Sequence, residues 1–475
     1  MSVQFPDNLT SFPRNLSWNL KKIQSSIIKS KIKINSDLTE IKPSQTSSFF
    51  MPIGRFLDFR SGVLYSTNAT CSGTGGIHFP RLGLASLIQN LQILANGRVL
   101  QSTNDYNMIY NILCDCEGYS SFEQATKRIT ENFDPSVTYT YPNGSSDPVA
   151  TFNANNTTND GGGTNDNKSY CVNNWLGFMN GSISCLNTND IGQLTLKITW
   201  APASACWYKT DATAPTDASY SLKDVFFTID ALTFTNNLYL TLVGDQLKND
   251  GLNVGYYDYV FQQFSSQAKS TGGINISTQI NTSSLDQVIA TFRPNNYDTI
   301  SELCLSTQVA TTNKTYQELA VTPLTTSAGV GTSQLGTYGA FNQSLYFRRD
   351  GSGYSSSSFY VNSSLALSSD SPIEVFNNSL QALSYNNLDI GSGGYHSGCH
   401  SLGFWCKNYF VDILSLENMS QDNNFWISGY NSNGGSIQIG YISKWATTTT
   451  VYPILIMRVT KQLNIKFGRL LDLVE

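Results

Sequence analysis

The sequence is poor in charge. Asp, Glu, Lys and Arg make up 13% of its 475 residues, about half of the roughly 25% that is usual in globular domains. Long surface helices need such residues to be both soluble and helical, so the composition excludes a mainly helical protein. The net charge of −5 gives no overall attraction to nucleic acid or to an anionic membrane.

Histidine and long apolar runs are also scarce. Three histidines argue against a histidine-dependent hydrolase or a multi-histidine metal site. No apolar run reaches the roughly 18 residues that cross a bilayer, and the first 22 residues lack the basic start and apolar core of a signal peptide. Nine scattered cysteines, an odd number, indicate mostly free thiols and synthesis in a reducing compartment.

Aromatic and hydroxyl-bearing residues are abundant instead. The chain holds 25 Tyr and 25 Phe, and Ser, Thr and Asn together approach a third of it. Such residues favour strands and turns, so we expect an all-β protein. The length suits two domains of about 200–240 residues.

Several segments show strand patterns. Residues 193–200 alternate, with Leu194, Leu196, Ile198 and Trp200 on one face, which predicts a half-buried strand. Asn96-Gly97 lies between two apolar runs and predicts a hairpin. Further strands are expected at 49–65, 224–235, 273–280, 284–293, 344–351, 408–417 and 436–443, with a strand pair at 452–474 and helices at 237–251 and 372–383.

These patterns predict two tandem eight-stranded antiparallel β-sandwiches with long inserted loops and a few short helices. The expected division is an N-terminal arm at 1–45, a first β-domain at 46–236 with an insertion at about 117–190, a helical connector at 237–253, and a second β-domain at 254–475 with a loop at about 306–341.

The N-terminal arm carries six basic residues between Arg14 and Lys33. Within it, Ile28, Ile32 and Ile34 alternate with lysines, which favours an edge strand protected by Lys. The alternative is a basic arm that reaches a neighbouring subunit or an anionic inner surface, such as a genome or a membrane.

One cluster has metal-ligand chemistry, namely His396, Cys399, His400 and Cys406. Its spacing does not match structural zinc sites, so we favour a plain loop-to-strand junction and predict no metal, cofactor-binding or catalytic residue.

Other motifs are weak. Cys114 and Cys116 are one residue short of a redox CxxC pair. The glycines of 73–78 favour a turn over a dinucleotide loop, and 156–167 lacks the final Glu of a calcium loop. No G-x-S-x-G or H-E-x-x-H occurs, although a distant pair of catalytic carboxylates stays open.

Two further groups have structural interpretations. Arg348, Arg349 and Asp350 suggest a local ion-pair turn, with a chain-to-chain contact as the alternative. The aromatic side chains favour a sandwich core over a ligand platform: Phe49, Phe50, Trp200, Trp207, Tyr256, Tyr257, Trp405 and Trp426.

The order of several segments is similar to a known family. They are the midpoint passage 237–261, the strand passage 284–296, the pair 344–351 and 372–383, the closing passages 408–418 and 426–475, and, in the first half, 87–113. In this order the chain resembles the double jelly-roll major capsid proteins of polinton-like viruses and virophages, in the lineage of adenovirus hexons and giant-virus capsid proteins.

The resemblance implies one upright eight-stranded jelly roll per half and a homotrimer with a pseudo-hexameric outline that tiles the icosahedral shell of a double-stranded DNA virus. It implies a virion protein made in the host cytoplasm or nucleus, without enzymatic activity, cofactor or small-molecule substrate. Its partners would be neighbouring capsomers, minor capsid or cement proteins and penton proteins. The alternatives are a viral or surface β-rich adhesin or lectin-like binding protein, and a carbohydrate-active enzyme on a β-sandwich.

Overall fold

The structure of the chain is a computed structural model. It describes residues 27–73, 77–80, 82–116, 137–140, 149–152, 169–182, 185–208, 215–234, 248, 251–302, 344–382, 402, 405–406, 409–417, 429–432, 434–466 and 470–474.

The first half of the chain forms two facing antiparallel sheets. The first has the order β1-β14-β4-β10, with β11 also pairing with β4, and the second has the order β3-β12-β6-β7. The strands are β1 (Ile27–Asn35), β3 (Thr46–Phe50), β4 (Phe56–Ser72), β6 (Ile88–Ala95), β7 (Arg98–Thr103), β10 (Tyr170–Val172), β11 (Cys185–Asn187), β12 (Leu194–Trp200) and β14 (Ser219–Phe234).

The second half repeats this arrangement. Its sheets have the orders β15-β24-β18-β22 and β17-β23-β20-β21. The strands are β15 (Leu252–Gln263), β17 (Ile274–Ile280), β18 (Leu285–Pro294), β20 (Tyr354–Val361), β21 (Ser364–Ser369), β22 (Asp412–Ser415), β23 (Ile437–Trp445) and β24 (Thr450–Lys466).

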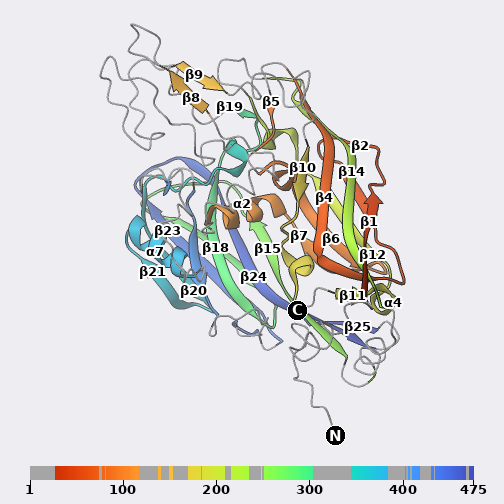
Figure 1. The fold of residues 1–475 in the computed structure, drawn as a ribbon. Coiled ribbons are helices and arrows are strands. Elements are labelled where there is room, and N and C mark those ends of the chain that lie inside the picture. The colour runs from red at the N-terminus through yellow and green to blue at the C-terminus, as the bar shows by residue number, and fades with distance from the viewer. Residues whose placement is uncertain are drawn as a thin grey trace.

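The two halves have the same topology. With β10 and β11 counted together as the sixth strand, the first, eighth, third and sixth strands form one sheet in each half, and the second, seventh, fourth and fifth form the other. In both halves the fifth strand leads into a helix, α2 (Tyr106–Cys116) or α7 (Pro372–Ala382). This is the jelly-roll arrangement, so the prediction of two tandem eight-stranded jelly rolls is confirmed. Figure 1 shows the two rolls side by side.

Local sequence explains the confirmed elements. Asn96 and Gly97 have φ values of 49° and 82°, as a type I′ turn requires, and they join β6 to β7. In β12 the predicted apolar face, Leu194, Leu196 and Ile198, is fully buried. The predicted helix at 372–383 is α7, which begins at a proline, the residue best tolerated at the first helical position.

The cores are rich in aromatic side chains. Phe49, Trp200, Trp207, Tyr256 and Trp405 are buried as predicted, whereas Phe50 is 53% exposed at the end of β3. Tyr257 is half-buried, and Trp426 lies outside the described residues.

One predicted strand is wrong. Residues 344–351 contain a 3-10 helix, η8 (Leu345–Phe347), rather than a strand. Tyr346 and Phe347 are both buried, and an extended strand would point these successive side chains to opposite faces. The 3-10 turn places both of them in the interior.

Some strands cross the expected boundaries. β1 and β2 (Glu40–Ile41) pair with β14, so part of the predicted arm belongs to the first sheet. β10 and β11 lie within the predicted insertion and pair with β4, and β15 begins within the predicted connector. Residues 237–247 and 306–341 lie outside the described residues, and the domain division itself stays a prediction.

Short elements complete the fold. A three-stranded sheet has the order β19-β13-β5, and it joins strands from the two halves of the chain.

None of the helices among the described residues has the length and apolar character needed to cross a membrane. The remaining elements are β5 (Ile77–His78), β8 (Val137–Thr140), β9 (Val149–Phe152), β13 (Trp207–Tyr208), β16 (Gln267–Ala268), β19 (Ser301–Glu302), β25 (Leu470–Val474), η2 (Gly83–Leu87), η4 (Gly177–Asn180), α4 (Thr188–Ile191) and η5 (Ala203–Ala205).

Candidate functional site

The most elaborate cluster of side chains lies where the two jelly rolls meet. There β15, the first strand of the second roll, packs against β7, α2 and η4 of the first roll. The hydroxyl of Tyr256 donates to the carbonyl of Leu100 at 2.6 Å, and the Tyr256 ring meets Phe178 edge-on at 5.4 Å. The backbone N–H of Ser182 donates to the carbonyl of Gly255 at 2.8 Å. The first strand of the second roll is therefore covered by the first roll.

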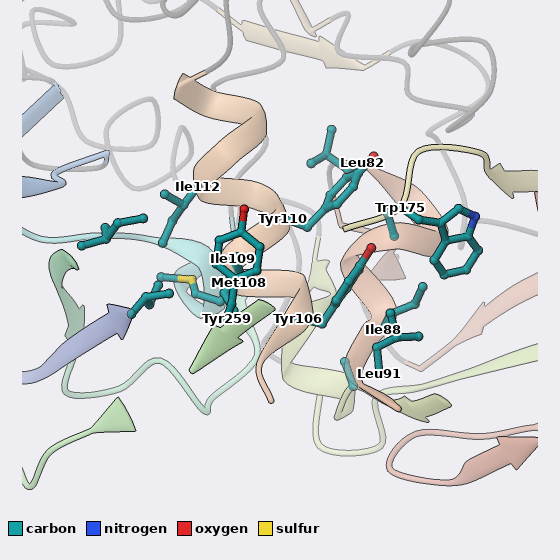
Figure 2. Packing of buried hydrophobic residues seen from close by; sticks show 14 of the residues in the cluster. Leu82, Ile88, Leu91, Tyr106, Met108, Ile109, Tyr110, Ile112, Trp175 and Tyr259 are labelled. Atoms are coloured by element: carbon teal, nitrogen blue, oxygen red, sulfur yellow. The ribbon is translucent and has the colours of Figure 1, made fainter. Parts of the chain in front are cut away.

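Helix α2 forms the hydrophobic part of this junction. Tyr106, Met108 and Ile109 are fully buried, and Figure 2 shows them in one cluster with Tyr259 of β15. Burial raises the pKa of the Tyr106 hydroxyl well above its usual range, and the neighbouring Tyr259 adds to the shift. Tyr106 is thus a neutral hydrogen-bonding group, and its oxygen accepts from the backbone N–H of Leu176 at 3.0 Å.

A buried carboxylate connects the two rolls. Asp258 of β15 accepts a hydrogen bond from Thr103 of β7 at 3.0 Å and lies 3.1 Å from the ammonium of Lys461. Burial raises the pKa of Asp258, and Lys461 opposes that shift. A desolvated charge is costly unless it is paired and hydrogen-bonded, so the position of Thr103 relative to Asp258 is constrained.

Arg293 is the second polar link. Its guanidinium lies 3.0 Å from the carboxylate of Asp105, which precedes α2 in the first roll, and it donates to Gln263 at 3.1 Å. It also lies over the rings of Tyr297 and Tyr346, at 4.8 and 5.0 Å from their centroids. A planar guanidinium that is both paired and stacked suits a buried interface.

Lys269 occupies a buried site in the second roll. Its fully buried ammonium lies 3.2 Å from Asp350, donates to the carbonyl of Ser352 at 3.1 Å and lies 4.5 Å from the Trp445 ring centroid. Burial acts to raise the pKa of Asp350, but Lys269 and Ser352 outweigh it and the pKa is lowered. The sequence favoured a local ion-pair turn for Asp350, but its carboxylate pairs instead with Lys269, which lies 81 residues earlier in the chain. Arg349 is fully buried beside Tyr409.

Two further carboxyl groups lie inside the second roll. Asp412 accepts hydrogen bonds from Ser357 at 2.6 Å and Tyr441 at 3.0 Å, and Asp286 accepts from Ser284 and Thr460, both at 2.7 Å. Burial raises the pKa of each carboxyl group to about 6. Both carboxyl groups therefore keep their protons to a higher pH than an exposed aspartate does.

The predicted metal-type cluster is only partly described. His396, Cys399 and His400 lie outside the described residues. Cys406 is buried, and burial raises the pKa of its thiol to about 11, so it is a protonated core residue. Within the described part of the chain, no group of three or more His, Cys, Asp or Glu side chains could hold a metal ion.

The weaker motifs are scattered. Cys114 is half-buried in α2, and the side chain of Cys116 is not described. Gly73 directly follows β4 and has a φ of 144°, and residues 74–76 and 156–167 lie outside the described residues.

The basic segment is an edge strand where it is described. β1 pairs with β14 along its whole length, which confirms the favoured interpretation of its alternating lysines. Lys29 lies 2.7 Å from Asp230, and the ammonium of Lys33 lies 3.9 Å from the Phe226 ring centroid. Residues 14–26 lie outside the described residues.

The buried charges at the junction were not predicted from the sequence. Asp258 and Arg293 stand in apolar, aromatic segments, and charged side chains are rarely buried unless they are paired. A charged residue within an apolar segment could therefore have indicated that Asp258 and Arg293 belong to ion pairs. It could not have identified Asp105 or Thr103 as their partners.

Comparisons with known proteins agree with this architecture. No protein-family model matches the chain, and no curated protein matches it. Among solved structures, the PBCV-1 virus capsid gives a TM-score of 0.55 at 12% identity, covering 95% of this chain and 97% of that one. The Sputnik virophage structure gives 0.55 at 11% identity, covering 94% and 88%.

The Faustovirus major capsid protein gives a TM-score of 0.50 at 10% identity, covering 93% of this chain and 91% of that one. At such identities the similarity concerns the fold, and it extends over both jelly rolls in each case. The chain has the double jelly-roll fold of these viral major capsid proteins.

Proposed function

We propose that the chain is the major capsid protein of an icosahedral double-stranded DNA virus, and that three copies form a capsomer with a pseudo-hexameric outline. The observation that carries the proposal is the duplication: one chain holds two jelly rolls with the same strand order in both sheets. Three such chains present six similar walls, which suits a hexagonally tiled shell.

The junction supports a structural role. Asp258, Lys461 and Thr103, together with Arg293 and Asp105, join the rolls through desolvated polar contacts. Solved structures with the same fold bear the names of a virus capsid, a virophage and a viral major capsid protein. The low charged fraction of 13% also suits a subunit whose surface is largely covered by neighbours, because interface cores are depleted in charge.

The proposed partners follow from a place in a shell. They are neighbouring capsomers, minor capsid or cement proteins, and penton proteins. The basic segment Arg14–Lys33 is proposed to contact neighbours, the genome or an internal membrane. The protein would be made in the host cytoplasm or nucleus and act in the virion, with no catalytic role, cofactor or small-molecule substrate.

The test is the mass of the purified full chain in solution, measured by sedimentation velocity. The expected species has three times the 52.3 kDa mass of one chain, and concentrated material should form hexagonal tiles in electron micrographs. A stable monomer under all assembly conditions would contradict the proposal.

A further inference from the structure

Strand pairing allows the first strands of the two rolls to be aligned residue by residue. Glu40 of β2 pairs with Lys223 of β14, and Gln267 of β16 pairs with Val451 of β24. Lys223 of β14 is therefore equivalent to Val451 of β24. Residues the same number of positions further along β14 and β24 are equivalent too, and so are the residues of β1 and β15 that pair with them. Ile28 of β1 is then equivalent to Tyr256 of β15, and three residues further along Lys31 is equivalent to Tyr259.

The hairpins that precede the helices can be aligned in the same way. β6–β7 and β20–β21 both have two-residue turns and a register irregularity after the second residue pair from the turn. Leu100 is therefore equivalent to Ala366. Because both helices begin three residues after the hairpin strand ends, Asn107 of α2 is equivalent to Ile373 of α7.

Equivalent positions differ sharply in exposure. Tyr256, Leu100 and Asn107 are buried at the junction within the chain. Their counterparts are open: Ile28 and Ile373 are each 56% exposed, and Ala366 is exposed. The molecule thus has one surface on β1 and another on β21 and α7 that lack the cover their equivalents receive.

The two uncovered surfaces are also complementary in charge. β1 presents Lys31, and the start of α7 presents Glu374 close to Asp370, whose backbone N–H donates to the Glu374 carboxylate at 2.7 Å. Within the chain, Tyr259, the equivalent of Lys31, lies in one cluster with Met108, the equivalent of Glu374 (Figure 2). An interaction between opposite charges would replace that apolar contact.

The surfaces cannot meet within one chain, because β1 and α7 lie at opposite ends of the molecule (Figure 1). A contact between them therefore joins two copies head to tail. Such heterologous contacts close into a ring when the rotation between copies permits it.

We propose that β1 of one copy docks against β21 and α7 of the next, repeating between copies the contact that β15 makes with β7 and α2 within the chain. This docking rests on the proposed function, because it assigns the surfaces that build the trimer. Around the ring, the contact between the two rolls of one chain then alternates with an equivalent contact between rolls of neighbouring chains.

The first experiment measures assembly of Ile28→Asp and Ile373→Asp by sedimentation velocity. Each substitution places a carboxylate in the proposed contact and should raise the dissociation constant of the subunit contact by about thirtyfold or more, as at the centre of an interface. Ile53→Asp is the matched control, since Ile53 is 50% exposed but lies outside both surfaces, and it should assemble like the wild type. Circular dichroism confirms that each variant is folded.

A second experiment uses the wild-type chain, so it does not depend on the folding of variants. Equal amounts of heavy- and light-isotope protein are mixed during assembly and cross-linked with a carbodiimide, which joins amines to adjacent carboxylates. Mass spectrometry should find heavy-to-light links between Lys31 and Glu374 or Asp370.

The outcomes separate the two proposals. A wild-type trimer that survives both aspartate substitutions and cross-links through other surfaces overturns the docking and leaves the capsid function standing. A wild-type chain that stays monomeric under all assembly conditions overturns both.

Discussion

Among the described residues, the first jelly roll buries a single charged side chain, Asp230, near the end of β14. The second roll, built on the same strand order, buries a whole set of them: Asp258, Lys269, Asp286, Arg293, Arg349, Asp350 and Asp412. Two domains with the same strand order can therefore differ in how many charged side chains they bury. Buried charges make the second roll sensitive to substitution and to pH in ways that the first roll is not.

The largest expected effect compares one core tryptophan from each roll. Trp200 and Trp445 are both fully buried, and each indole N–H donates to a serine hydroxyl, at 2.9 and 3.0 Å. Replacement by Ala should lower the free energy of unfolding by about 4 kcal/mol in either case. The loss should be larger for Trp445→Ala, because Lys269 then loses the ring it lies over. Urea denaturation measures both, and equal losses would contradict a role for the buried lysine.

The next effect concerns the ion pair at the junction. Arg293→Ala should lower the free energy of unfolding by about 3 kcal/mol, since it removes one partner of a buried pair and leaves Asp105 without its guanidinium. Arg55→Ala, at an exposed position of the first roll, is the control and should change stability by less than about 0.5 kcal/mol. A similar small loss for Arg293→Ala in urea denaturation would show that the pair adds little to the junction.

A smaller effect is the pH dependence of the second roll. Burial raises the pKa of Asp286 and Asp412 from the ordinary 3.8 to about 6, so the folded state binds protons that the unfolded chain has released. Stability contributed by these groups is present at low pH and is lost as pH rises through about 6. The free energy of unfolding should thus fall by about 2 kcal/mol between pH 5 and pH 8.

Asp412→Asn is the variant that isolates this effect, because the amide stays neutral and its oxygen can still accept from Ser357 or Tyr441. Its unfolding free energy, measured by urea denaturation at several pH values, should vary less between pH 5 and pH 8 than that of the wild type. Identical pH profiles for the two proteins would rule out ionisation of Asp412 in the folded state.

The smallest effect compares two equivalent hairpin turns. Gly97 and Ser363 hold the same position, with φ values of 82° and 65°, a region that costs a non-glycine residue about 1 kcal/mol. Gly97→Ala should destabilise the protein by about 1 kcal/mol, because open space surrounds the new methyl group and strain alone acts. Ser363→Gly should stabilise it by a few tenths of a kcal/mol. Thermal melting of both variants checks the opposite signs.

Much of the fold could be predicted from local pattern. The alternation of Leu194, Leu196 and Ile198, the Asn96-Gly97 turn and the proline at the start of α7 each act within a few residues, so the sequence alone reveals them. The 3-10 helix at Leu345–Phe347 could not be predicted in this way, because its consecutive aromatic side chains are accommodated by surroundings built from distant segments.

The contacts at the junction could not be predicted from local pattern either, because they join distant segments. Asp105 and Arg293 are 188 residues apart, and their pairing depends on how two finished jelly rolls pack together. The alternating lysines of β1 likewise allowed both an edge strand and a free arm, and the pairing with β14 decided between them for residues 27–35.

The small sheet β19-β13-β5 has a mechanical consequence. Trp207 and Tyr208 of β13 pair in parallel with Ser301 and Glu302 of β19, and they pair on the other side with β5, so backbone hydrogen bonds run from one roll to the other. A ladder of backbone bonds must break before its strands shift. A hinge motion between the rolls is therefore opposed at this sheet, and a load applied to one roll is transmitted to the other through the backbone itself.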